Sequence, residues 1–344
     1  MTDIGLARRS LFRRLAAVVA AGVLAVVSAA CSSGGGTETS AAPAQASSSA
    51  DSAFPVTIQH KHGTTTIPSR PQRVVTVGWN DQDFVLALGV VPVATRQWFD
   101  EYDNFPWVKQ ALGGKPLPTF SAEINYEAII AQRPDLILAI YETINKETYD
   151  KLSQIAPTVV QSADYPDEQT PWDVQTLTTG KALGKEAEAQ ALVDKVKSRI
   201  EAEKKAHPEF AGKVLVVDFG PENGEHWLIP ENDPRRALFD ALGFAAQEEK
   251  DAISEERLDL LDRDILFVNG ATKEDMLKSS VFSRLNVVKE DRTIYTSFST
   301  PLGGALSYSG PNALLYALDV LVPELANAAD GDPKTEVKDL SNLT

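Results

Sequence analysis

Residues 124–138 read INYEAIIAQRPDLIL, and residues 253–267 read ISEERLDLLDRDILF. The two stretches lie 129 residues apart and align without a gap. Each contains a polar residue that can cap a helix, a glutamate two positions later, a short helical pattern, an aspartate and then an apolar strand. A unit that occurs twice in this way predicts a chain built from two similar halves.

The residues upstream of each copy continue the parallel. Apolar runs of strand length occupy residues 73–77 and 213–217, and each is followed by a helical pattern that ends in Leu-Gly, at Gly89 and Gly243. These glycines lie 154 residues apart, so the second half carries a longer first loop. The alternation predicts an α/β fold with two Rossmann-like α/β lobes, each a three-layer sandwich around a mainly parallel sheet. Functional loops are then expected at the carboxyl ends of the strands.

A continuous helical pattern without Gly or Pro joins the two halves, from Lys185 to His207. Its apolar stripe consists of Ala189, Leu192, Val193, Val196 and Ile200. With the segment before it, the pattern predicts one long connecting helix or a broken pair, on the order of 30 Å long. We expect this rod to hold the halves apart and to limit their closure.

The chain therefore divides into six expected segments. They are a signal peptide (1–30), a lipidated flexible tether (31–53), an N-terminal α/β lobe (54–171), a connecting helix (172–207), a C-terminal α/β lobe (208–328) and a frayed tail (329–344). The tether is rich in Ser, Gly, Ala and Thr, which cannot bury enough apolar surface to fold. The tail is polar, and we expect it to fray.

The composition is that of an ordinary globular protein. The 344 residues are 43% hydrophobic and 24% charged, which is enough apolar content for two packed domains. The formal net charge is −15, and residues 31–344 alone carry −18 because the first thirty residues carry +3. A body this acidic, without a basic tract, argues against nucleic-acid binding and against electrostatic docking on anionic lipid.

The N-terminus carries the features of an export signal. Four arginines precede an apolar run, Leu15–Val27, that is too short to span a bilayer. The sequence Ser-Ala-Ala-Cys follows at 28–31 and contains the only cysteine of the chain, so no intrachain disulfide can form. This segment resembles a bacterial lipoprotein signal, which implies diacylation of Cys31 and anchoring on the extracytoplasmic face of the cell membrane. Arg8 and Arg9 also fit a twin-arginine signal, so the export route, Sec or Tat, stays open.

Five short stretches within residues 54–328 carry a resemblance to a known family. They are PQRVV (71–75), DQD (81–83), NYE (125–127), RPDLI (133–137) and SEE (254–256). The chain resembles the substrate-binding proteins of ABC importers for ferric siderophores, haem or vitamin B12, and most closely the iron–siderophore binding proteins of actinobacteria. The resemblance implies two lobes joined by a long helix and an iron(III)–siderophore complex in the cleft between them. It also implies a monomer that is not an enzyme and has no intrinsic cofactor.

The same resemblance implies that each lobe presents one surface glutamate to arginines of the importer's permease. The matching positions are Glu127 and Glu256, one in each copy of the repeat. The helix dipole alone also explains a glutamate in the first turn of a helix. Recurrence at identical spacing favours docking, because two separated anions can engage a symmetric permease dimer bivalently.

Ligand contacts are expected from the loops that follow strands in both halves. The candidate ligand-binding side chains in these loops are Trp79, Arg96, Trp98, Tyr141, Trp227 and Tyr308. Aromatic walls suit a bulky organic chelate, although each aromatic residue alone can equally be explained by core packing. The Arg96 guanidinium could hydrogen-bond the anionic oxygens of a catecholate, hydroxamate or carboxylate complex, or it could form an ordinary ion pair.

Direct metal binding is not predicted, because the four histidines do not form a set with carboxylates. Only His226 lies in an expected cleft loop, so haem or a corrinoid remains an alternative cargo, with His226, Tyr141 or Tyr308 as the axial ligand of a haem. A secreted hydrolase and a scaffold lipoprotein without a ligand are the alternatives from other classes. The chain contains neither a G-x-S-x-G nor an H-E-x-x-H motif.

Overall fold

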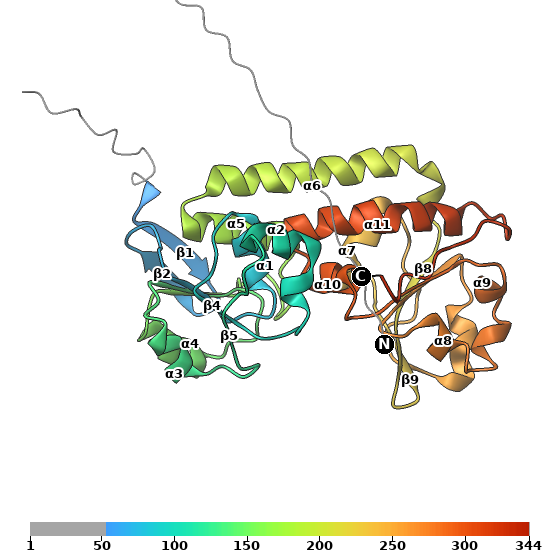
Figure 1. Ribbon diagram of the computed structural model, residues 1–344, viewed down its shortest axis with the longest axis horizontal. Helices are drawn as coiled ribbons and strands as arrows, with labels where there is room; N and C mark the ends of the chain where they lie inside the picture. Colours follow the sequence, from blue (N-terminus) through green and yellow to red (C-terminus); the bar gives the residue numbers. More distant parts are fainter. Residues whose placement is uncertain (1–52, 344) are drawn as a thin grey trace, which may run out of the picture. The chain divides into compact units, whose positions relative to one another are not determined.

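The computed structural model describes residues 53–343, which belong to one compact unit of the chain. The expected signal peptide, Cys31 and nearly all of the expected tether lie outside these described residues. Within residues 53–343, no helix is both long enough and apolar enough to cross a membrane. Two five-stranded sheets form the centres of two lobes, one in each half of the chain (Figure 1).

The N-terminal lobe is built on a fully parallel sheet in the order β5-β4-β3-β6-β7. Its strands are β3 (Val74–Thr76), β4 (Ala94–Arg96), β5 (Thr119–Phe120), β6 (Leu136–Ala139) and β7 (Thr158–Val160). Its helices are α1 (Asp81–Ala87), the 3-10 helix η2 (Tyr102–Asn104), α2 (Pro106–Leu112), α3 (Tyr126–Ala131) and α4 (Lys146–Ser153). An antiparallel pair, β1 (Val56–His60) and β2 (Gly63–Ile67), precedes them. Every residue of β6 is buried, as expected for a central parallel strand covered on both faces.

The C-terminal lobe contains a mixed sheet in the order β10-β9-β8-β11-β12. Its strands are β8 (Leu215–Glu222), β9 (Glu225–Leu228), β10 (Ile253–Ser254), β11 (Ile265–Asn269) and β12 (Thr293–Thr296). Its α-helices are α7 (Ala237–Leu242), α8 (Lys273–Met276), α9 (Asn286–Lys289), α10 (Pro301–Tyr308) and α11 (Pro311–Ala329). The 3-10 helices are η3 (Pro208–Phe210), η4 (Pro234–Arg236), η5 (Glu255–Leu261) and η6 (Phe282–Arg284). Strands β8, β11 and β12 are parallel, whereas β9 and β10 are antiparallel to their neighbours.

The repeat seen in the sequence corresponds to equivalent local structure in the two lobes. Asp135, just before β6, accepts hydrogen bonds from the backbone N–H groups of Gln72 and Arg73, both at 2.8 Å. Asp264, just before β11, accepts one from Val214 at 2.8 Å. Asp135 thus holds the start of β3 beside β6, and Asp264 holds the start of β8 beside β11.

The connector between the lobes is a broken pair of helices. Helix α5 (Trp172–Leu183) ends at Gly184, whose φ of +64° is a left-handed conformation that glycine adopts readily. Helix α6 (Glu186–Ala206) follows as the long member of the pair. Its buried residues are Ala189, Val193, Val196 and Ile200, four of the five in the predicted stripe. It packs on α5, α7 and α11 (Figure 1), and with the two sheets it confirms the predicted class of two α/β lobes joined by a long helix.

The prediction that a rod holds the lobes apart is wrong. Each lobe has its own smaller apolar clusters, but the largest cluster is continuous across both lobes. It contains Phe105 and Trp107 of the N-terminal lobe together with Leu302 of α10 and Leu318 of α11. The physical reason is that α11 is apolar around most of its circumference, so helices of both lobes must cover it.

The prediction of a frayed tail is also wrong for residues 330–343. No helix or strand forms there, but Val337 and Leu340 are buried in the cluster shared by both lobes. The N–H of Leu340 donates to the carbonyl of Tyr295 at 3.0 Å, and the N–H of Val337 donates to the carboxylate of Asp291 at 2.8 Å. Two apolar side chains three positions apart anchor a segment whose composition is otherwise polar.

Candidate functional site

A cavity of about 590 Å³ lies between the two lobes, near the carboxyl ends of the parallel strands. The aromatic residues that line it are Trp79, Trp98, Phe99 and Tyr141 from the N-terminal lobe and Phe219 and Phe298 from the C-terminal lobe. The charged residues that line it are Asp167, Glu168, Asp233 and Arg235. The cavity therefore offers rigid aromatic walls and a few charged groups, the usual character of a site for an organic ligand.

Three of the predicted residues reach the cavity because each follows the end of a parallel strand. Trp79 follows β3, Trp98 follows β4 and Tyr141 follows β6. The N–H of Trp79 donates to the carbonyl of Tyr141 at 3.1 Å, and the ring centroids of Trp79 and Trp98 lie 5.8 Å apart. Trp98 also stacks on Phe99, with 4.8 Å between centroids. The sequence alone thus identified one wall of the cavity.

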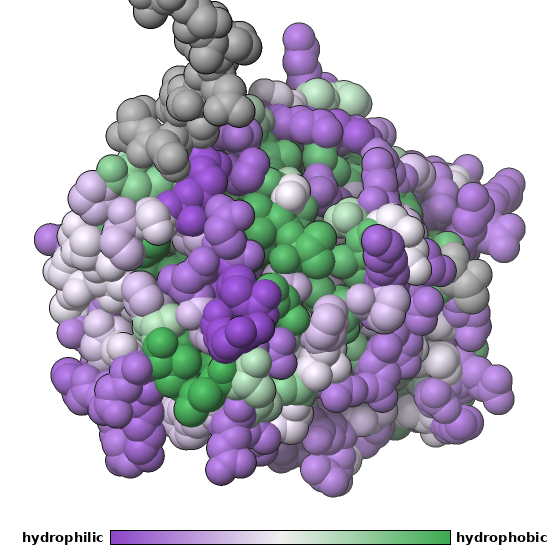
Figure 2. All heavy atoms as spheres, turned by 60° about the vertical axis from the view of Figure 1, so that its left-hand side comes forward, coloured by the Kyte–Doolittle hydropathy of each residue, from purple (hydrophilic) through white to green (hydrophobic). Residues whose placement is uncertain are grey.

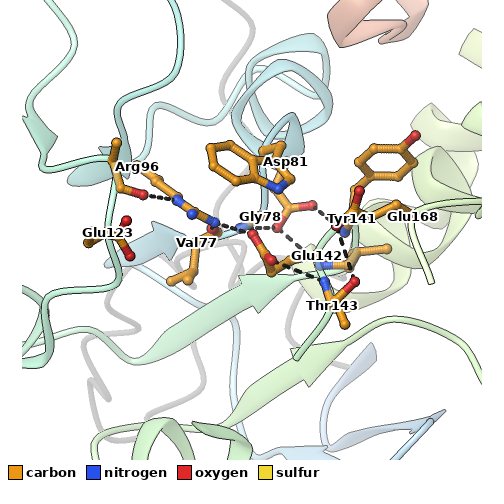
Figure 3. Close-up of polar contacts among 12 residues, drawn as sticks. Val77, Gly78, Asp81, Arg96, Glu123, Tyr141, Glu142, Thr143 and Glu168 are labelled. Atoms are coloured by element: carbon orange, nitrogen blue, oxygen red, sulfur yellow. Dashed lines mark hydrogen bonds and ion pairs between the residues drawn. The ribbon is translucent and has the colours of Figure 1, made fainter. Parts of the chain in front are cut away.

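Arg96 supports this wall from behind and is not among the residues that line the cavity. Its side chain is only 7% exposed, and its guanidinium carbon lies 3.4 Å from the centroid of the Trp79 ring. The guanidinium forms an ion pair with Glu142 and donates to the carbonyl of Ala122 (Figure 3). A buried guanidinium needs such partners. Of the two alternatives left open for Arg96, the structure shows the ion pair, and the proposed contact with a ligand is not seen at the cavity lining.

Asp81 joins the two loops that carry Trp79 and Tyr141 (Figure 3). Its buried carboxylate accepts hydrogen bonds from the N–H groups of Gly78 and Ile140, both at 3.1 Å, and of Tyr141 at 3.3 Å. Burial raises the pKa of Asp81 to about 6, although these donors oppose the shift. Residues 81–83 contributed to the family resemblance, but no positioning role was predicted for Asp81. A carboxylate at the start of the helix after β3 was the available signal for this positioning role.

Tyr308 is buried behind the cavity wall instead of lining it. Its side chain is 1% exposed and packs on Trp98 and Tyr102, with 5.0 and 4.4 Å between ring centroids. Its hydroxyl accepts a hydrogen bond from the N–H of Phe99 at 3.4 Å. Tyr308 sits at the last position of α10, where an apolar helix end meets the N-terminal lobe, and this explains why it is core.

Trp227 does not reach the cavity. It lies on β9, where His226 and Leu228 are buried and the Trp227 side chain between them is 49% exposed. We predicted Trp227 to lie in a loop after a strand, but the chain forms a β-hairpin there, because Asn223 and Gly224 both adopt positive φ (55° and 81°) and turn β8 back into β9. An Asn-Gly pair between two stretches of alternating apolar and polar residues is the strongest local signal for a hairpin, and this hairpin was not predicted.

None of the four charged residues that line the cavity was predicted from the sequence, and two of them, Asp233 and Arg235, form a pair. The Arg235 guanidinium donates to the Asp233 carboxylate from Nε at 2.8 Å and from Nη2 at 2.6 Å, and it lies over the ring of Phe219, 5.0 Å from its centroid. Asp233 also caps the 3-10 helix η4 by accepting from the N–H of Arg235. The sequence Asp-Pro at 233–234 is a helix-start signal that pointed to this loop.

Tyr141 keeps a neutral phenol in the cavity wall. Burial raises the pKa of its hydroxyl to about 12, and the carboxylates of Asp233 and Glu168 add to the effect. Among residues 53–343, no group of three or more His, Cys, Asp or Glu side chains is arranged to hold a metal ion. His226, another of the three alternative axial ligands, is buried against Asp218 with 2.7 Å between Nδ1 and Oδ2, and it does not line the cavity.

The two glutamates that were predicted to dock are exposed at equivalent positions. Glu127 lies in the first turn of α3, where Asn125 Oδ1 caps the helix by accepting from the N–H of Ala128 at 3.0 Å. Glu256 lies in the first turn of η5, a 3-10 helix in place of the expected α-helix. Ile130, one turn after Glu127, is 55% exposed, and Figure 2 shows hydrophobic residues reaching the surface on this side of the molecule.

Comparisons with known proteins agree with this geometry. The family model described as "Periplasmic binding protein" matches residues 74–300. The chain is 28% identical to the iron(3+)-hydroxamate-binding protein YxeB of Bacillus subtilis, over 75% of this chain and 84% of that protein. It is 33% identical to a periplasmic solute binding protein from Mycobacterium smegmatis, with a TM-score of 0.74 over 80% of this chain and 98% of that one. It is 27% identical to PiaA of Streptococcus pneumoniae in complex with ferrichrome, with a TM-score of 0.69 over 80% and 99% of the two chains.

Proposed function

The chain belongs to the periplasmic binding protein family, and on this premise we propose that it captures an iron(III)–siderophore complex between its lobes and delivers it to an ABC importer. The resemblance found in the sequence is confirmed at the level of the family. The observation that carries the proposal is a cavity of about 590 Å³ with aromatic walls from both lobes. Such a cavity suits a bulky chelate in which the siderophore already surrounds the iron.

The relatives support an iron complex as the cargo. YxeB is named for an iron(3+)-hydroxamate, and PiaA was solved with ferrichrome. Neither name supports the alternative of haem or a corrinoid. Of the three residues considered as axial ligands of a haem, only Tyr141 lines the cavity, whereas His226 and Tyr308 do not.

Tryptophan fluorescence tests the proposal directly, because Trp79 and Trp98 line the cavity. We expect saturable quenching by at least one ferric complex from a panel of hydroxamate, catecholate and carboxylate siderophores, with haem and cobalamin included. The iron-free siderophore should bind more weakly. Trp98→Phe should reduce the ligand-induced change, whereas Trp227→Phe, the matched control outside the cavity, should preserve it. A chain that responds to no ferric complex would be a scaffold, and the proposal would be wrong.

We also propose that the protein works outside the cytoplasm, anchored to the membrane by acylation of Cys31. The support is the sequence of the N-terminal segment, which ends in a cysteine after an apolar run and small residues. In cells that express the full chain, Cys31→Ser should move the protein from the membrane fraction to the soluble fraction. Unchanged membrane association of this variant would contradict the anchor.

Delivery is proposed to use Glu127 and Glu256 as contacts with the permease. Both are exposed, and within residues 53–343 neither has an ion-pair partner. Glu127→Ala combined with Glu256→Ala should preserve ligand affinity and impair uptake into cells. The matched control is Glu123→Ala with Glu274→Ala, which removes one exposed glutamate from each lobe outside these two helix turns. Lost ligand binding in the first pair, or equal impairment by the control, would contradict docking.

A further inference from the structure

We propose that the cavity selects ferric complexes that are neutral or carry a net positive charge and that Glu168 sets this preference. The inference rests on the proposed function, since it names the class of siderophore complex that the same cavity takes. Four charged side chains line the cavity: Asp167, Glu168, Asp233 and Arg235. The sum of their formal charges is negative. The ion pairs that these side chains form show which of the charges is not compensated.

The single lining cation is already neutralised. Arg235 makes two parallel hydrogen bonds to Asp233, at 2.8 and 2.6 Å, a bidentate pair that leaves little positive charge for a ligand. The Asp233 carboxylate is largely buried, with 12% of its side chain exposed, which strengthens the pairing. The other nearby guanidinium, Arg96, lies behind Trp79 and is paired with Glu142.

Of the two remaining carboxylates, only Glu168 has no cation as a partner among residues 53–343. Asp167 forms an ion pair with Lys61. Glu168 is exposed at the cavity, its Oε1 accepts a hydrogen bond from the Thr143 hydroxyl at 3.1 Å, and no described Lys, Arg or His lies within ion-pair distance of it. The net charge presented to a ligand is therefore negative and is centred on Glu168.

The aromatic walls act in the same direction. Six aromatic side chains line the cavity, and the faces of such rings carry negative electrostatic potential, which attracts cations and disfavours anions. Burial is the largest cause of the raised pKa of Tyr141, and Asp233 and Glu168 add to it while Arg235 opposes it. The field of the acidic body, −18 over residues 31–344, has the same sign at longer range.

A matched pair of ligands isolates the effect of charge. The probes are the ferric complex of a linear trihydroxamate with a pendant ammonium (net +1), the same complex with that amine acetylated (neutral), and a ferric tris-catecholate (net −3). Affinities are measured by tryptophan quenching at low and high salt. We expect the +1 complex to bind about fivefold more tightly than its acetylated form, less so at high salt, and the −3 complex to bind far more weakly than both.

Within the variant Glu168→Gln, the ratio of the affinities for the +1 and the neutral complex should fall from about fivefold to less than about twofold, because the aromatic walls and the acidic body supply only the smaller part of the preference. Asp164→Asn, an exposed carboxylate in the same loop that does not line the cavity, should preserve the difference. Tightest binding of the tris-catecholate, or a charge preference of unchanged size in Glu168→Gln, would overturn this inference while leaving the proposed function intact. If none of these three complexes binds but a ferric carboxylate complex of the wider panel does, the inference is overturned and the proposed function stands. If no ferric complex of the panel binds, the proposed function itself is overturned.

Discussion

The two lobes share one half of their sheets and differ in the other half. On the shared side, β3-β6-β7 and β8-β11-β12 are parallel and contain the sequence repeat. On the other side, the N-terminal lobe continues with the parallel strands β4 and β5, whereas the C-terminal lobe folds back into the antiparallel strands β9 and β10. A crossover brings the ends of β3 and β4 to the same edge, while a hairpin points β9 the opposite way.

This difference decides which residues form the cavity. Trp98 follows β4 and lines the cavity, but Trp227 lies on β9 and is exposed elsewhere. The C-terminal lobe instead supplies its charged cavity residues from the loop around η4, with Asp233 and Arg235. A position just after a predicted strand therefore predicts a cavity residue where the strand is parallel to its neighbours, as for Trp98, and fails where a hairpin reverses the chain, as for Trp227.

The lobes also differ in how deeply an arginine is buried near the cavity. Substitution of the buried arginine is expected to have the largest effect on stability. The partners Glu142 and Asp233 are equally buried, each 12% exposed, but Arg96 is 7% exposed and Arg235 is 45% exposed. Arg96→Met breaks a pair buried on both sides, so the free energy of unfolding should fall by about 3 kcal/mol. Arg235→Gln breaks a pair that is open to solvent and leaves the backbone N–H bond to Asp233 in place, so it should cost less than about 1 kcal/mol. Urea unfolding measures both. Equal losses of stability would show that the Arg96–Glu142 pair stabilises the fold no more than the Asp233–Arg235 pair does.

A double variant separates loss of the pair from loss of packing. Arg96→Met combined with Glu142→Gln leaves no unpaired buried charge, so it should recover more than half of the stability lost by Arg96→Met alone. No recovery would mean that Arg96 stabilises the lobe mainly by packing on Trp79.

Buried titratable groups should make the stability of the protein depend on pH in a different range for each lobe. In the N-terminal lobe, burial raises the pKa of Asp83 to about 6, and the carboxyl accepts hydrogen bonds from Trp107 and Tyr102 but has no ion pair among the described residues. The folded state therefore binds this proton more tightly than the unfolded state. The resulting stabilisation is complete below about pH 4 and is lost as the pH rises through about 6, about 3 kcal/mol in all.

Asp83→Asn keeps the acceptor oxygen and removes the titration. Relative to the wild type, it should gain about 3 kcal/mol between pH 4 and pH 7, as measured by urea unfolding at several pH values. In the C-terminal lobe, burial lowers the pKa of His226, but Asp218 and Glu255 outweigh it and leave the pKa raised. The wild type should therefore lose the stabilisation that this histidine gives only as the pH rises above about 6.5. The free energy of unfolding of His226→Gln, relative to that of the wild type, should stay constant below this pH and rise above it. A flat difference for Asp83→Asn between pH 4 and pH 7 would contradict the buried, unpaired carboxyl.

The contrast between Trp98 and Trp227 predicts a difference in ligand affinity. Trp98→Ala removes an aromatic wall of the cavity and should weaken binding of the ferric complex by about 2 kcal/mol, or roughly 30-fold. Trp227→Ala should change affinity less than twofold. Isothermal titration with the best ligand of the panel measures both, and circular dichroism checks that the variants fold. Equal losses would mean that the β9 hairpin contacts the ligand.

The sequence predicted the parts of the fold that depend on local pattern. Buried strands, the stripe of α6 and the strand-exit residues Trp79, Trp98 and Tyr141 followed from periodicity and from the geometry of parallel sheets. The partners of side chains could not be predicted in this way. Arg96 pairs with Glu142, 46 positions away, and Tyr308 packs on residues more than 200 positions away, so their burial depends on tertiary contacts that no local pattern encodes. The Asn-Gly hairpin was predictable and was missed.

The smallest expected difference lies within the repeat itself. Asp135 accepts two backbone N–H groups at the start of β3, and Asp264 accepts one at the start of β8. Asp135→Ala should therefore lower the free energy of unfolding by about 2 kcal/mol and Asp264→Ala by about 1 kcal/mol, with additive effects in the double variant because the sites lie in separate sheets. Ligand affinity should not change in either. Equal losses of stability in the two single variants would mean that the number of backbone hydrogen bonds does not determine how much each aspartate stabilises its lobe. A loss of ligand affinity in only one variant would mean that the start of that strand influences the cavity.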